Sequence, residues 1–416
     1  MKNWAGNLEY RSSGLERPAT LEALQQIVSA ATAVKPLGSR HCFNEIADTR
    51  GTHVSLDLLA SAPEIDTARH TVRVAGSSSY GIVAEYLQAH GFALPNLASL
   101  PHISVAGAIQ TGTHGSGVTN GSLATAVSAV ELVRASGDPV RLTTDDGGDF
   151  RAAVVGLGAL GIITHVELDI EPSYQVRQQV FEGLPWDRVL ADFDAVASDG
   201  YSVSLFTDYA GNSIPQVWRK VRDDEWPAEV PAEFHGARPA LTAMHPLPGM
   251  SAENCTGQLN VPGPWLDRLP HFQLQFTPSN GDELQSEYLL PRKHAAAALT
   301  ELRELSTILE PLLFVSEIRT VAADDFWMSP SFEQDSVALH LTWKPLQHQV
   351  EAILPLLEER LAPFGARPHW GKLFAAGATS LAGRYRHFDD FRTLAAGYDP
   401  TGKFRNTFLD KVLFGG

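Results

Sequence analysis

Two loops rich in small residues constrain this chain more than any other feature. The first, residues 36–44, reads Pro-Leu-Gly-Ser-Arg-His-Cys-Phe-Asn and follows a short, mostly apolar run at 30–37. By itself it is more typical of an ordinary turn. The second, residues 99–117, combines several glycines with too few apolar side chains to pack as a core element. Glycine and serine let a backbone approach an anionic group closely. Two such loops in one domain therefore predict a large cofactor that is held at both ends.

Length, charge and cysteine content narrow the class of protein. A chain of 416 residues is long enough for two domains with sizeable cores. The net charge of −16 argues against nucleic-acid binding and against attraction to an anionic membrane, and a neutral substrate fits it at least as well as an anionic one. The two cysteines, Cys42 and Cys255, make neither a disulfide framework nor a zinc site, so we predict no metal. The sequence shows no signal region and no apolar run of membrane-spanning length, which predicts a cytoplasmic protein.

The first part of the chain predicts an α+β domain. Thr20 is a suitable N-cap for a helix with an apolar face, and the apolar stripe Ile82, Val83, Tyr86 and Leu87 predicts a second helix. Apolar runs at 126–133 and 140–143, separated by a Gly-Asp turn, predict a hairpin, and 161–170 predicts another strand. No glycine triplet of the dinucleotide type opens a helix, which disfavours a nicotinamide cofactor.

Later strands alternate apolar and polar side chains, after a proline-rich and irregular stretch at 223–270. Two predicted helices, at 291–308 and 347–361, separate these strands. The pattern predicts an antiparallel sheet with its apolar face packed on helices and its polar face forming the floor of a pocket. A solvated face with surface ion pairs explains the pattern about as well. The side chains expected on the polar face are Gln285, Glu317, Arg319, His340 and Thr342.

Together these features resemble the vanillyl-alcohol-oxidase type of flavoprotein, and within it the polyol branch, the alditol oxidases. Besides the two loops, the segments that carry the resemblance are Asn3–Asn7, Ser316–Thr320, His340–Trp343, Pro368–Lys372 and Asp399–Phe404. The resemblance covers nearly the whole chain. It implies a VAO/PCMH-type FAD-binding domain at 1–172, a substrate-binding α+β cap domain with an antiparallel sheet at 173–374, and a C-terminal return to the FAD-binding domain at 375–416.

The resemblance also implies FAD, bonded covalently through its 8α-methyl group to His41; the alternative for His41 is a hydrogen bond to the cofactor. Arg40 stands where many relatives have glycine. Cys42 stands where serine is usual, and it keeps a weaker donor of similar size. The other cofactor-lining positions that the resemblance implies are Leu37, Gly38, Ser39, Arg40, Cys42, Ser99, Ser104, Gly107, Thr111, Gly112, Thr113, His114, Ile162 and His369.

The substrate pocket that the resemblance implies lies over the flavin ring, at Ser99, Glu317, Arg319, His340, Thr342 and Lys372, and the polar face adds Gln285. Glutamate and arginine two residues apart on one strand can form a rigid donor–acceptor pair for vicinal hydroxyls. Lys372 is the candidate base for the C1 hydroxyl proton if it is neutral; if charged, it would stabilise negative charge on the reduced flavin. His340 is the alternative base.

The expected activity is FAD-dependent oxidation of the terminal C1 hydroxyl of alditols such as xylitol or sorbitol to the aldose, with dioxygen reduced to hydrogen peroxide. One alternative is a dehydrogenase of the same fold that acts on a sugar-acid lactone or a polyol and uses another electron acceptor. The small side chain of Ala98 permits oxygen to approach but does not distinguish the two. Another alternative is a flavin-binding module without turnover, which the polar set argues against. We expect a monomer that interacts with a polyol and dioxygen.

Overall fold

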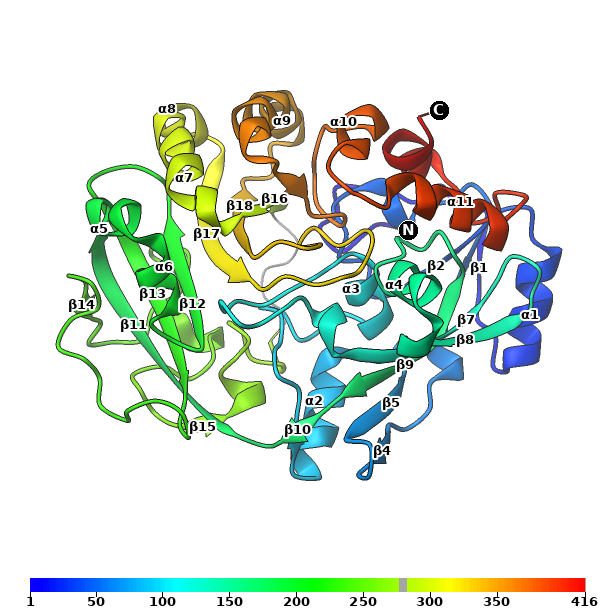
Figure 1. Cartoon of the computed structure of the whole chain (residues 1–416), viewed down its shortest axis with the longest axis horizontal. Coiled ribbons are helices and arrows are strands. Elements are labelled where there is room, and N and C mark those ends of the chain that lie inside the picture. The colour runs from blue at the N-terminus through cyan, green and yellow to red at the C-terminus, as the bar shows by residue number, and fades with distance from the viewer. Residues whose placement is uncertain (277–282, 416) are drawn as a thin grey trace.

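A computed structural model describes residues 1–276 and 283–415 of the chain. The elements of the first 172 residues and those of the following two hundred form two groups, and the C-terminal helices lie against the first group (Figure 1). Both chain ends lie on the same side of the molecule in this view. The predicted domain boundaries agree with this grouping but stay an interpretation.

The first group contains two sheets. One is antiparallel, with the order β4 (Glu64–Asp66), β5 (Thr71–Ala75), β9 (Ile162–Asp169), β7 (Val127–Val133) and β8 (Pro139–Thr143). The other is parallel, with the order β1 (Gly14–Glu16), β3 (Thr52–Val54) and β2 (Val34–Pro36). A small antiparallel pair joins β6 (Phe92–Ala93) to β10 (Glu171–Pro172). The hairpin predicted from residue 126 and the strand predicted from residue 161 are confirmed as β7–β8 and β9.

The first helix of this group begins after its predicted cap, Thr20. The hydroxyl of Thr20 accepts a hydrogen bond from the backbone N–H of Ala23 and caps α1. The helices are α1 (Leu21–Ala30), α2 (Tyr80–Ala89), α3 (Val105–Gln110) and α4 (Gly148–Val154). The second predicted helix is confirmed as α2; its buried face includes Val83 and Leu87 together with Tyr80 and Ala84, whereas Ile82 is 57% exposed.

The second group is built on one large antiparallel sheet. Its order is β14-β11-β13-β12-β17-β18-β16-β19, and β15 pairs with β11. The bounds are β11 (Gln175–Pro185), β12 (Ser202–Thr207), β13 (Ser213–Arg222), β14 (Arg238–Pro239), β15 (Gly263–Pro264), β16 (Leu284–Pro291), β17 (Leu313–Val321), β18 (Ser336–Trp343) and β19 (Arg367–Pro368). The register places His340 of β18 opposite both Glu287 of β16 and Glu317 of β17. Three polar side chains therefore share one row across the sheet.

Helices cover the apolar face of this sheet, as predicted. They are α5 (Trp186–Ala191), α6 (Phe193–Ser198), α7 (Ala295–Glu304), α8 (Ser306–Leu309) and α9 (Gln347–Leu361), and α7 and α9 lie side by side in Figure 1. The single helix predicted at 291–308 was wrong. Residues 292–294 form a 3-10 turn, and the α-helix is interrupted at Leu305, between α7 and α8. Leu339, Leu341 and Trp343 of β18 are fully buried in the core that these helices complete. Each such burial contributes about 1.5–3 kcal/mol.

Shorter elements complete the fold. Residues 223–270 are largely irregular, as predicted, apart from β14, β15 and 3-10 turns at 252–254 and 265–267. The tail contains α10 (Ala378–Ala382), α11 (Phe388–Tyr398), α12 (Thr407–Leu409) and a π-helical turn at 410–414. The side-chain amide of Asn406 donates to the carbonyls of Glu45, Ile46 and Asp48, which ties the tail to the first group.

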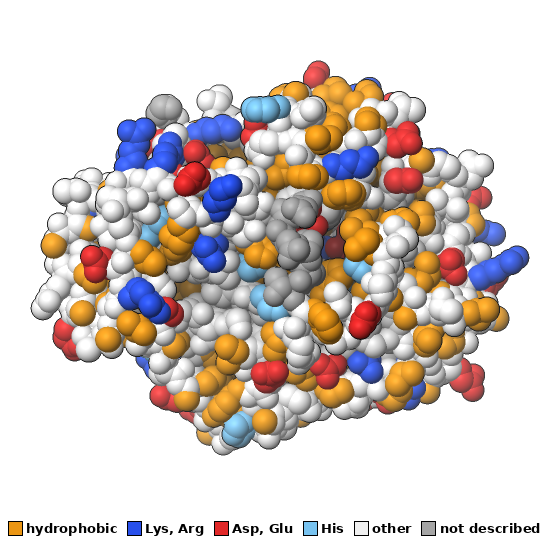
Figure 2. Space-filling model, turned by 180° about the vertical axis from the view of Figure 1, so that it is seen from behind, with side chains coloured by type: hydrophobic (Ala, Val, Ile, Leu, Met, Phe, Trp, Pro, Cys, Tyr) orange, Lys and Arg blue, Asp and Glu red, His pale blue; other side chains and the backbone are white. Residues whose placement is uncertain are grey.

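The surface mixes acidic and basic side chains on the face shown in Figure 2, and this face is hollowed near its middle, with histidine side chains beside the hollow. No helix within the described residues combines the length and the apolar character needed to cross a bilayer.

Candidate active site

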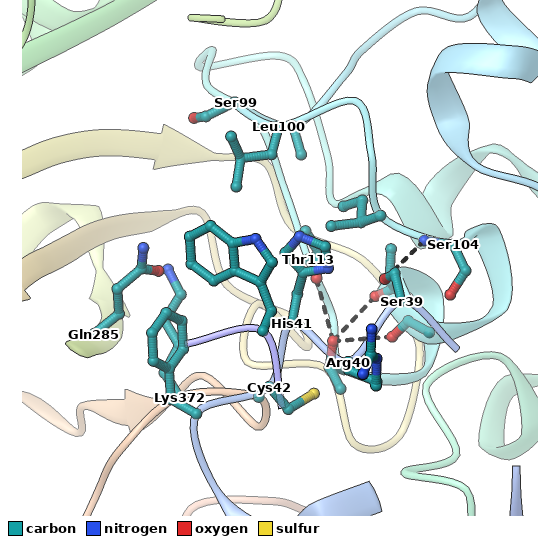
Figure 3. A pocket seen from close by; sticks show the side chains of 18 of the residues that line it. Ser39, Arg40, His41, Cys42, Ser99, Leu100, Ser104, Thr113, Gln285 and Lys372 are labelled. Carbon is teal, nitrogen blue, oxygen red and sulfur yellow. Dashed lines mark hydrogen bonds between the residues drawn. The ribbon is translucent and has the colours of Figure 1, made fainter. Parts of the chain in front are cut away.

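A cavity of about 490 Å³ is lined by both small-residue loops, by the polar face of the large sheet and by residues 369–372. Its walls therefore come from segments far apart in the sequence. Figure 3 shows His41 and Cys42 from the first loop, Ser99 and Ser104 from the second, and Gln285 and Lys372 from the C-terminal half, all around this space.

The first loop follows β2 and directs His41 into the cavity. Arg40 has φ of 63°, a left-handed conformation that glycine adopts more readily than a residue with a side chain. The N-terminal arm covers this loop: the backbone N–H of Trp4 donates to the carbonyl of Arg40, and the Trp4 ring stacks on His41 with ring centroids 5.0 Å apart. The amide of Asn3 donates to the carbonyl of Cys42. The N-terminal arm thus orients the histidine.

The imidazole of His41 is neutral, and one of its ring nitrogens is free to react. Burial lowers the pKa of His41 to about 4, so the imidazole is neutral at pH 7. Its Nδ1 atom is buried and makes no hydrogen bond within the described part of the chain. A buried, neutral nitrogen without a partner is available to a group that enters the cavity.

The two loops meet closely at Ser104, the residue that precedes α3. Its backbone N–H donates to the hydroxyl of Ser39 over 3.2 Å (Figure 3). A Cβ atom on Gly38 would lie 2.5 Å from the Ser104 hydroxyl oxygen, so a side chain at position 38 would crowd this contact. Small residues are therefore required where the loops touch.

The polar face of the sheet centres on Glu287, a fully buried carboxylate. Arg319 Nη2 lies 2.6 Å from Glu287 Oε1, and Lys372 Nζ lies 2.7 Å from Glu287 Oε2. Lys372 Nζ is also 2.5 Å from Nδ1 of His340, whose Nε2 lies 3.1 Å from the hydroxyl oxygen of Thr342. One continuous network therefore joins polar side chains of the three strands β16, β17 and β18 to the loop at 369–372.

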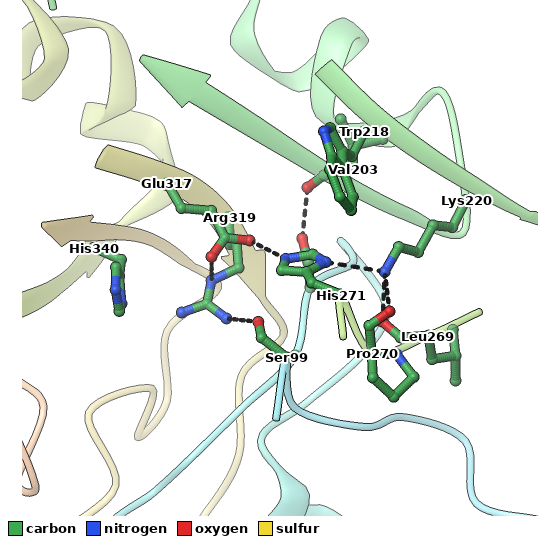
Figure 4. Close-up of polar contacts among 12 residues, drawn as sticks. Ser99, Val203, Trp218, Lys220, Leu269, Pro270, His271, Glu317, Arg319 and His340 are labelled. Atoms are coloured by element: carbon green, nitrogen blue, oxygen red, sulfur yellow. Dashed lines mark hydrogen bonds and ion pairs between the residues drawn. The ribbon is translucent and has the colours of Figure 1, made fainter. Parts of the chain in front are cut away.

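Glu317 completes this network on the neighbouring strand. Its Oε2 atom lies 3.6 Å from Nε of Arg319, and its Oε1 atom lies 2.7 Å from Nε2 of His271. Arg319 Nη1 reaches the Ser99 hydroxyl at 3.5 Å, which connects the sheet to the second loop (Figure 4). Each of these charged side chains is nearly enclosed.

The charges of the network balance. Burial alone would raise the pKa of Glu287, but the charges of Lys372 and Arg319 outweigh it and hold that pKa well below its usual range. Burial would likewise raise the pKa of Glu317, and Arg319 lowers it below the usual range. Two carboxylates thus face one guanidinium and one ammonium. These four side chains carry no net charge together, which suits an uncharged substrate.

Lys372 and His340 form a coupled pair. Burial lowers the pKa of Lys372, while Glu287 opposes that shift. Burial, with the nearby charge of Lys372, lowers the pKa of His340 to about 4, so this ring is neutral at pH 7. The shared contact places the Lys372 N–H on Nδ1 of His340 and leaves Nε2–H to donate to Thr342.

Comparison with known proteins identifies the family. The family model for the FAD binding domain matches residues 13–143, and that for D-arabinono-1,4-lactone oxidase matches residues 279–412. An alditol oxidase from a Streptomyces species is 51% identical over 99% of this chain and 99% of its own length. The chain belongs to the alditol oxidase family. An L-gulono-1,4-lactone dehydrogenase from Mycobacterium tuberculosis is 27% identical over 99% of this chain and 98% of its own.

Solved structures confirm the fold class. A cholesterol oxidase from B. sterolicum superposes with a TM-score of 0.78 at 15% identity, covering 99% of this chain and 96% of its own. The predicted FAD-linked oxidase fold, with an FAD-binding domain and an antiparallel sheet in the second group, is therefore correct.

The cavity of this alditol oxidase family member fits FAD. Its small-residue loops approach each other too closely for side chains, and the unpaired Nδ1 of His41 lies at the same cavity as the polar network. Of the predicted cofactor positions, those that line the cavity are Leu37, Gly38, Ser39, Arg40, His41, Cys42, Ser99, Ser104, Gly107, Thr111, Thr113, His114 and His369. These side chains and their backbones would hold the cofactor.

Two predicted cofactor positions do not line the cavity. The resemblance implies a cofactor contact of Ile162 through its backbone. Its side chain is fully buried in a separate core with Val34 and Val54, while its neighbours Gly161 and Ile163 line the cavity, so the backbone contact stays a prediction. Gly112 has φ of 69° and lies behind the loop, against Pro330. All the predicted substrate-binding and catalytic residues, by contrast, line the cavity.

Three polar residues of this site were missed from the sequence. Glu287 lies on the predicted polar face, and its alternation with Gln285 is the signal that could have assigned it a role. His271 carried no signal, because it lies in an irregular segment. Lys220 shares a face of β13 with Gln216 and Arg222, and this alternation is the signal that could have pointed to it.

Proposed function

We propose that the protein oxidises the terminal C1 hydroxyl of an alditol such as xylitol or sorbitol to the aldose and transfers the electrons to dioxygen, which becomes hydrogen peroxide. The observation that carries this proposal is the buried, charge-balanced network of Glu287, Glu317, Arg319 and Lys372 at the cavity that also contains His41. A polyol offers hydroxyl groups that both donate and accept, and it carries no charge.

Glu317 and Arg319 are the proposed recognition pair. The carboxylate accepts from one substrate hydroxyl while the guanidinium donates to the next, as their spacing on β17 allows. Arg319 cannot swing away, because Glu287 holds its Nη2 at 2.6 Å. Ser99, Thr342 and Gln285 add neutral hydrogen-bonding groups around the same space.

Lys372 is the proposed partner of the reacting hydroxyl. Lys372 can accept the C1 hydroxyl proton only as the neutral amine, a form that burial favours and that Glu287 opposes. Once it has the proton, Glu287 at 2.7 Å is its counter-charge. In its ammonium form the same side chain would stabilise negative charge that develops at the cofactor. His340 stays the alternative base, although both its nitrogens already have partners.

FAD supplies the two-electron redox chemistry when it is bound. We infer that it is bonded covalently through His41, supported by the neutral ring, the unpaired Nδ1 and the stacking of Trp4.

The test uses the purified holoenzyme in one cuvette. Xylitol is added without oxygen, the flavin absorbance is followed, and air is then admitted. Bleaching that air reverses, with peroxide formed in equal amount, is the expected result. Bleaching that air leaves unchanged would replace the oxidase by a dehydrogenase. No bleaching with any alditol would remove the polyol assignment.

A sugar-acid lactone is the second candidate substrate. The family model named for D-arabinono-1,4-lactone oxidase spans residues 279–412, which include Glu287, Glu317 and Lys372. The same cuvette with an aldonolactone in place of xylitol distinguishes the two. Faster bleaching by the lactone would favour this candidate.

We further propose a cytoplasmic monomer. Size-exclusion chromatography with light scattering measures the mass directly, and a value near 45.1 kDa is expected.

A further inference from the structure

The irregular segment that precedes β16 delivers a buried histidine to the back of the polar site. His271 is 5% exposed, and its Nε2 lies 2.7 Å from Glu317 Oε1 (Figure 4). The edges of Phe206 and Trp218 enclose the ring, with centroids 5.5 and 5.1 Å away. The backbone N–H of His271 donates to the carbonyl of Ser99 over 3.2 Å. The ring therefore has one available orientation.

A buried lysine lies on the other side of this ring. Lys220 of β13 is 1% exposed. Its Nζ lies 2.5 Å from the carbonyl of Leu269, 3.3 Å from that of Pro270 and 3.2 Å from Nδ1 of His271 (Figure 4). These three acceptors match the three N–H groups of an ammonium. Burial lowers the pKa of Lys220 to about 7, but the neutral amine would leave one acceptor unpaired, so the surroundings favour the charged form.

These contacts set the direction in which the hydrogen bonds run from Lys220 through His271 to Glu317. In its charged form Lys220 can only donate, so Nδ1 of His271 then accepts. Burial and the charge of Lys220 lower the pKa of His271 to about 4, so the ring is neutral at pH 7 and its proton lies on Nε2. Nε2–H then donates to Oε1 of Glu317. The second carboxylate oxygen of Glu317 remains beside Arg319, its partner in the proposed recognition pair for substrate hydroxyls.

We propose that His271 is a positioning residue that holds Glu317 in its substrate-binding orientation, and that Lys220 fixes the tautomer of His271 that does so. The proposal deepens the proposed polyol oxidation and rests on it. Packing alone would not require this arrangement: an apolar side chain could fill the place of His271, and a buried ammonium is costly without a task. The hydrogen bonds from Lys220 to His271 and from His271 to Glu317 hold the Glu317 carboxylate in one position. Glu317 can therefore discriminate among polyol hydroxyls by their geometry.

The first test compares two variants of His271 in the holoenzyme. His271→Leu keeps the volume and loses the donor, whereas His271→Gln keeps an N–H that reaches Glu317. Loss of a hydrogen bond to a charged group predicts a rise of about ten- to hundredfold in KM for xylitol in His271→Leu, with a smaller change in kcat. His271→Gln is expected to recover most of that loss. Flavin content and melting temperature verify that both variants fold.

The outcomes of this test decide the proposal. A KM in His271→Leu equal to that of the wild type would overturn it. So would equal losses in both variants accompanied by equal losses of melting temperature, because these would indicate packing alone.

The second test removes the cation. In Lys220→Met, Nδ1 of His271 no longer receives a fixed N–H, and Glu317 alone would favour a protonated ring. The charged or titratable groups that face the ring are Lys220, Glu317 and Arg319; Cys255 acts on Lys220, and His340 acts on Glu317. We expect the pH profile of kcat/KM in the variant to show ionisation of the His271 ring, between about pH 5 and 8, in place of the ionisation of Lys220 near pH 7. Identical pH profiles would contradict the role of Lys220.

A direct readout separates this inference from the proposed function. The ¹⁵N chemical shifts of His271, assigned by comparison with His271→Gln, report which nitrogen carries the proton. A protonated Nε2 and an unprotonated Nδ1 in the wild type are expected whether or not xylitol is a substrate, and the reverse tautomer would overturn the chain. If that tautomer is found but no polyol bleaches the flavin, the proposed function fails and the hydrogen-bond chain stands.

Discussion

At the scale of single residues, the site depends on charges that only balance as a group. Glu287 contacts both Arg319 and Lys372 through its two oxygens. Without Glu287 both cations would lose a buried counter-charge. A buried charge without a partner is far more costly than an exposed one. The role of any one member is therefore measured best by a change that preserves its volume.

Lys372→Met should slow flavin reduction by xylitol at least about a hundredfold, the usual contribution of a positioned proton-transfer group. The dissociation constant for xylitol should change much less, because Glu317 and Arg319 remain. Anaerobic stopped-flow measurement separates the two quantities. Lys293→Met, at an exposed position, is the control. An unchanged reduction rate in Lys372→Met would remove the role assigned to this lysine.

His41→Ala should abolish covalent flavin attachment. The neutral, buried ring is the proposed nucleophile, and no other side chain is proposed to bond the cofactor. The measurement is yellow fluorescence of the denatured polypeptide in a gel, expected for the wild type and for the exposed control His90→Ala. Fluorescence that persists in denatured His41→Ala would place the bond elsewhere.

At the scale of elements, the parallel sheet β1–β3–β2 sets where the cofactor loop begins. The loop leaves β2 at Pro36, and β2 is held in register by β3. Gly51 precedes β3, and a Cβ atom at this position would lie 1.9 Å from the backbone oxygen of Ala33. A side chain here would push β3 away from β2. The sheet and the loop therefore require a residue without a Cβ atom at position 51.

Gly51→Ala should accordingly lower the free energy of unfolding by about 3 kcal/mol, the upper end for overpacking, since the clash is with backbone. Gly14→Ala in β1 is the matched control, because a Cβ atom there meets nothing within 4 Å. Chemical denaturation of both variants checks this. Equal stabilities of the two would mean that the strands separate without cost.

At the scale of the whole molecule, the tail joins segments from opposite ends of the sequence. Lys403 donates to the carbonyls of Val28, Ser29 and Ala135, and the backbone N–H of Val34 donates to its carbonyl. Asn406 caps α12 with its side-chain oxygen and contacts residues 45–48 with its side-chain nitrogen. The last helices are therefore a structural part of the cofactor-binding group.

Asn406→Ser tests this closure. Serine keeps a capping oxygen for Leu409 but loses the amide donor to three carbonyls, so the free energy of unfolding should fall by about 1–3 kcal/mol. Thr393→Ala on the exposed face of α11 should change it by no more than about 0.5 kcal/mol. Thermal and chemical unfolding measure both. A stability of Asn406→Ser equal to that of the control would show that the tail is held by packing alone.

Patterns of neighbouring residues are enough to predict the local parts of this protein. The alternation of β17 and β18 placed Glu317, Arg319, His340 and Thr342 on one face, because successive side chains of a strand point in opposite directions. Thr20 predicted the start of α1, since its hydroxyl satisfies a free backbone N–H of the first turn. The motifs predicted the family and the two cofactor loops. These are properties of neighbouring residues, which a linear pattern contains.

Side-chain contacts between these local parts depend on the tertiary structure. Glu287 and Lys372 are 85 positions apart, and their contact depends on how the loop at 369–372 lies over β16. The same holds for Trp4 on His41 and for Lys220 behind His271, which comes from a segment without periodicity. Ile162 turned into a core for the same reason: burial is settled by what packs on each face of β9. Side-chain contacts between distant segments follow from the docking of the sheets, which no local pattern specifies.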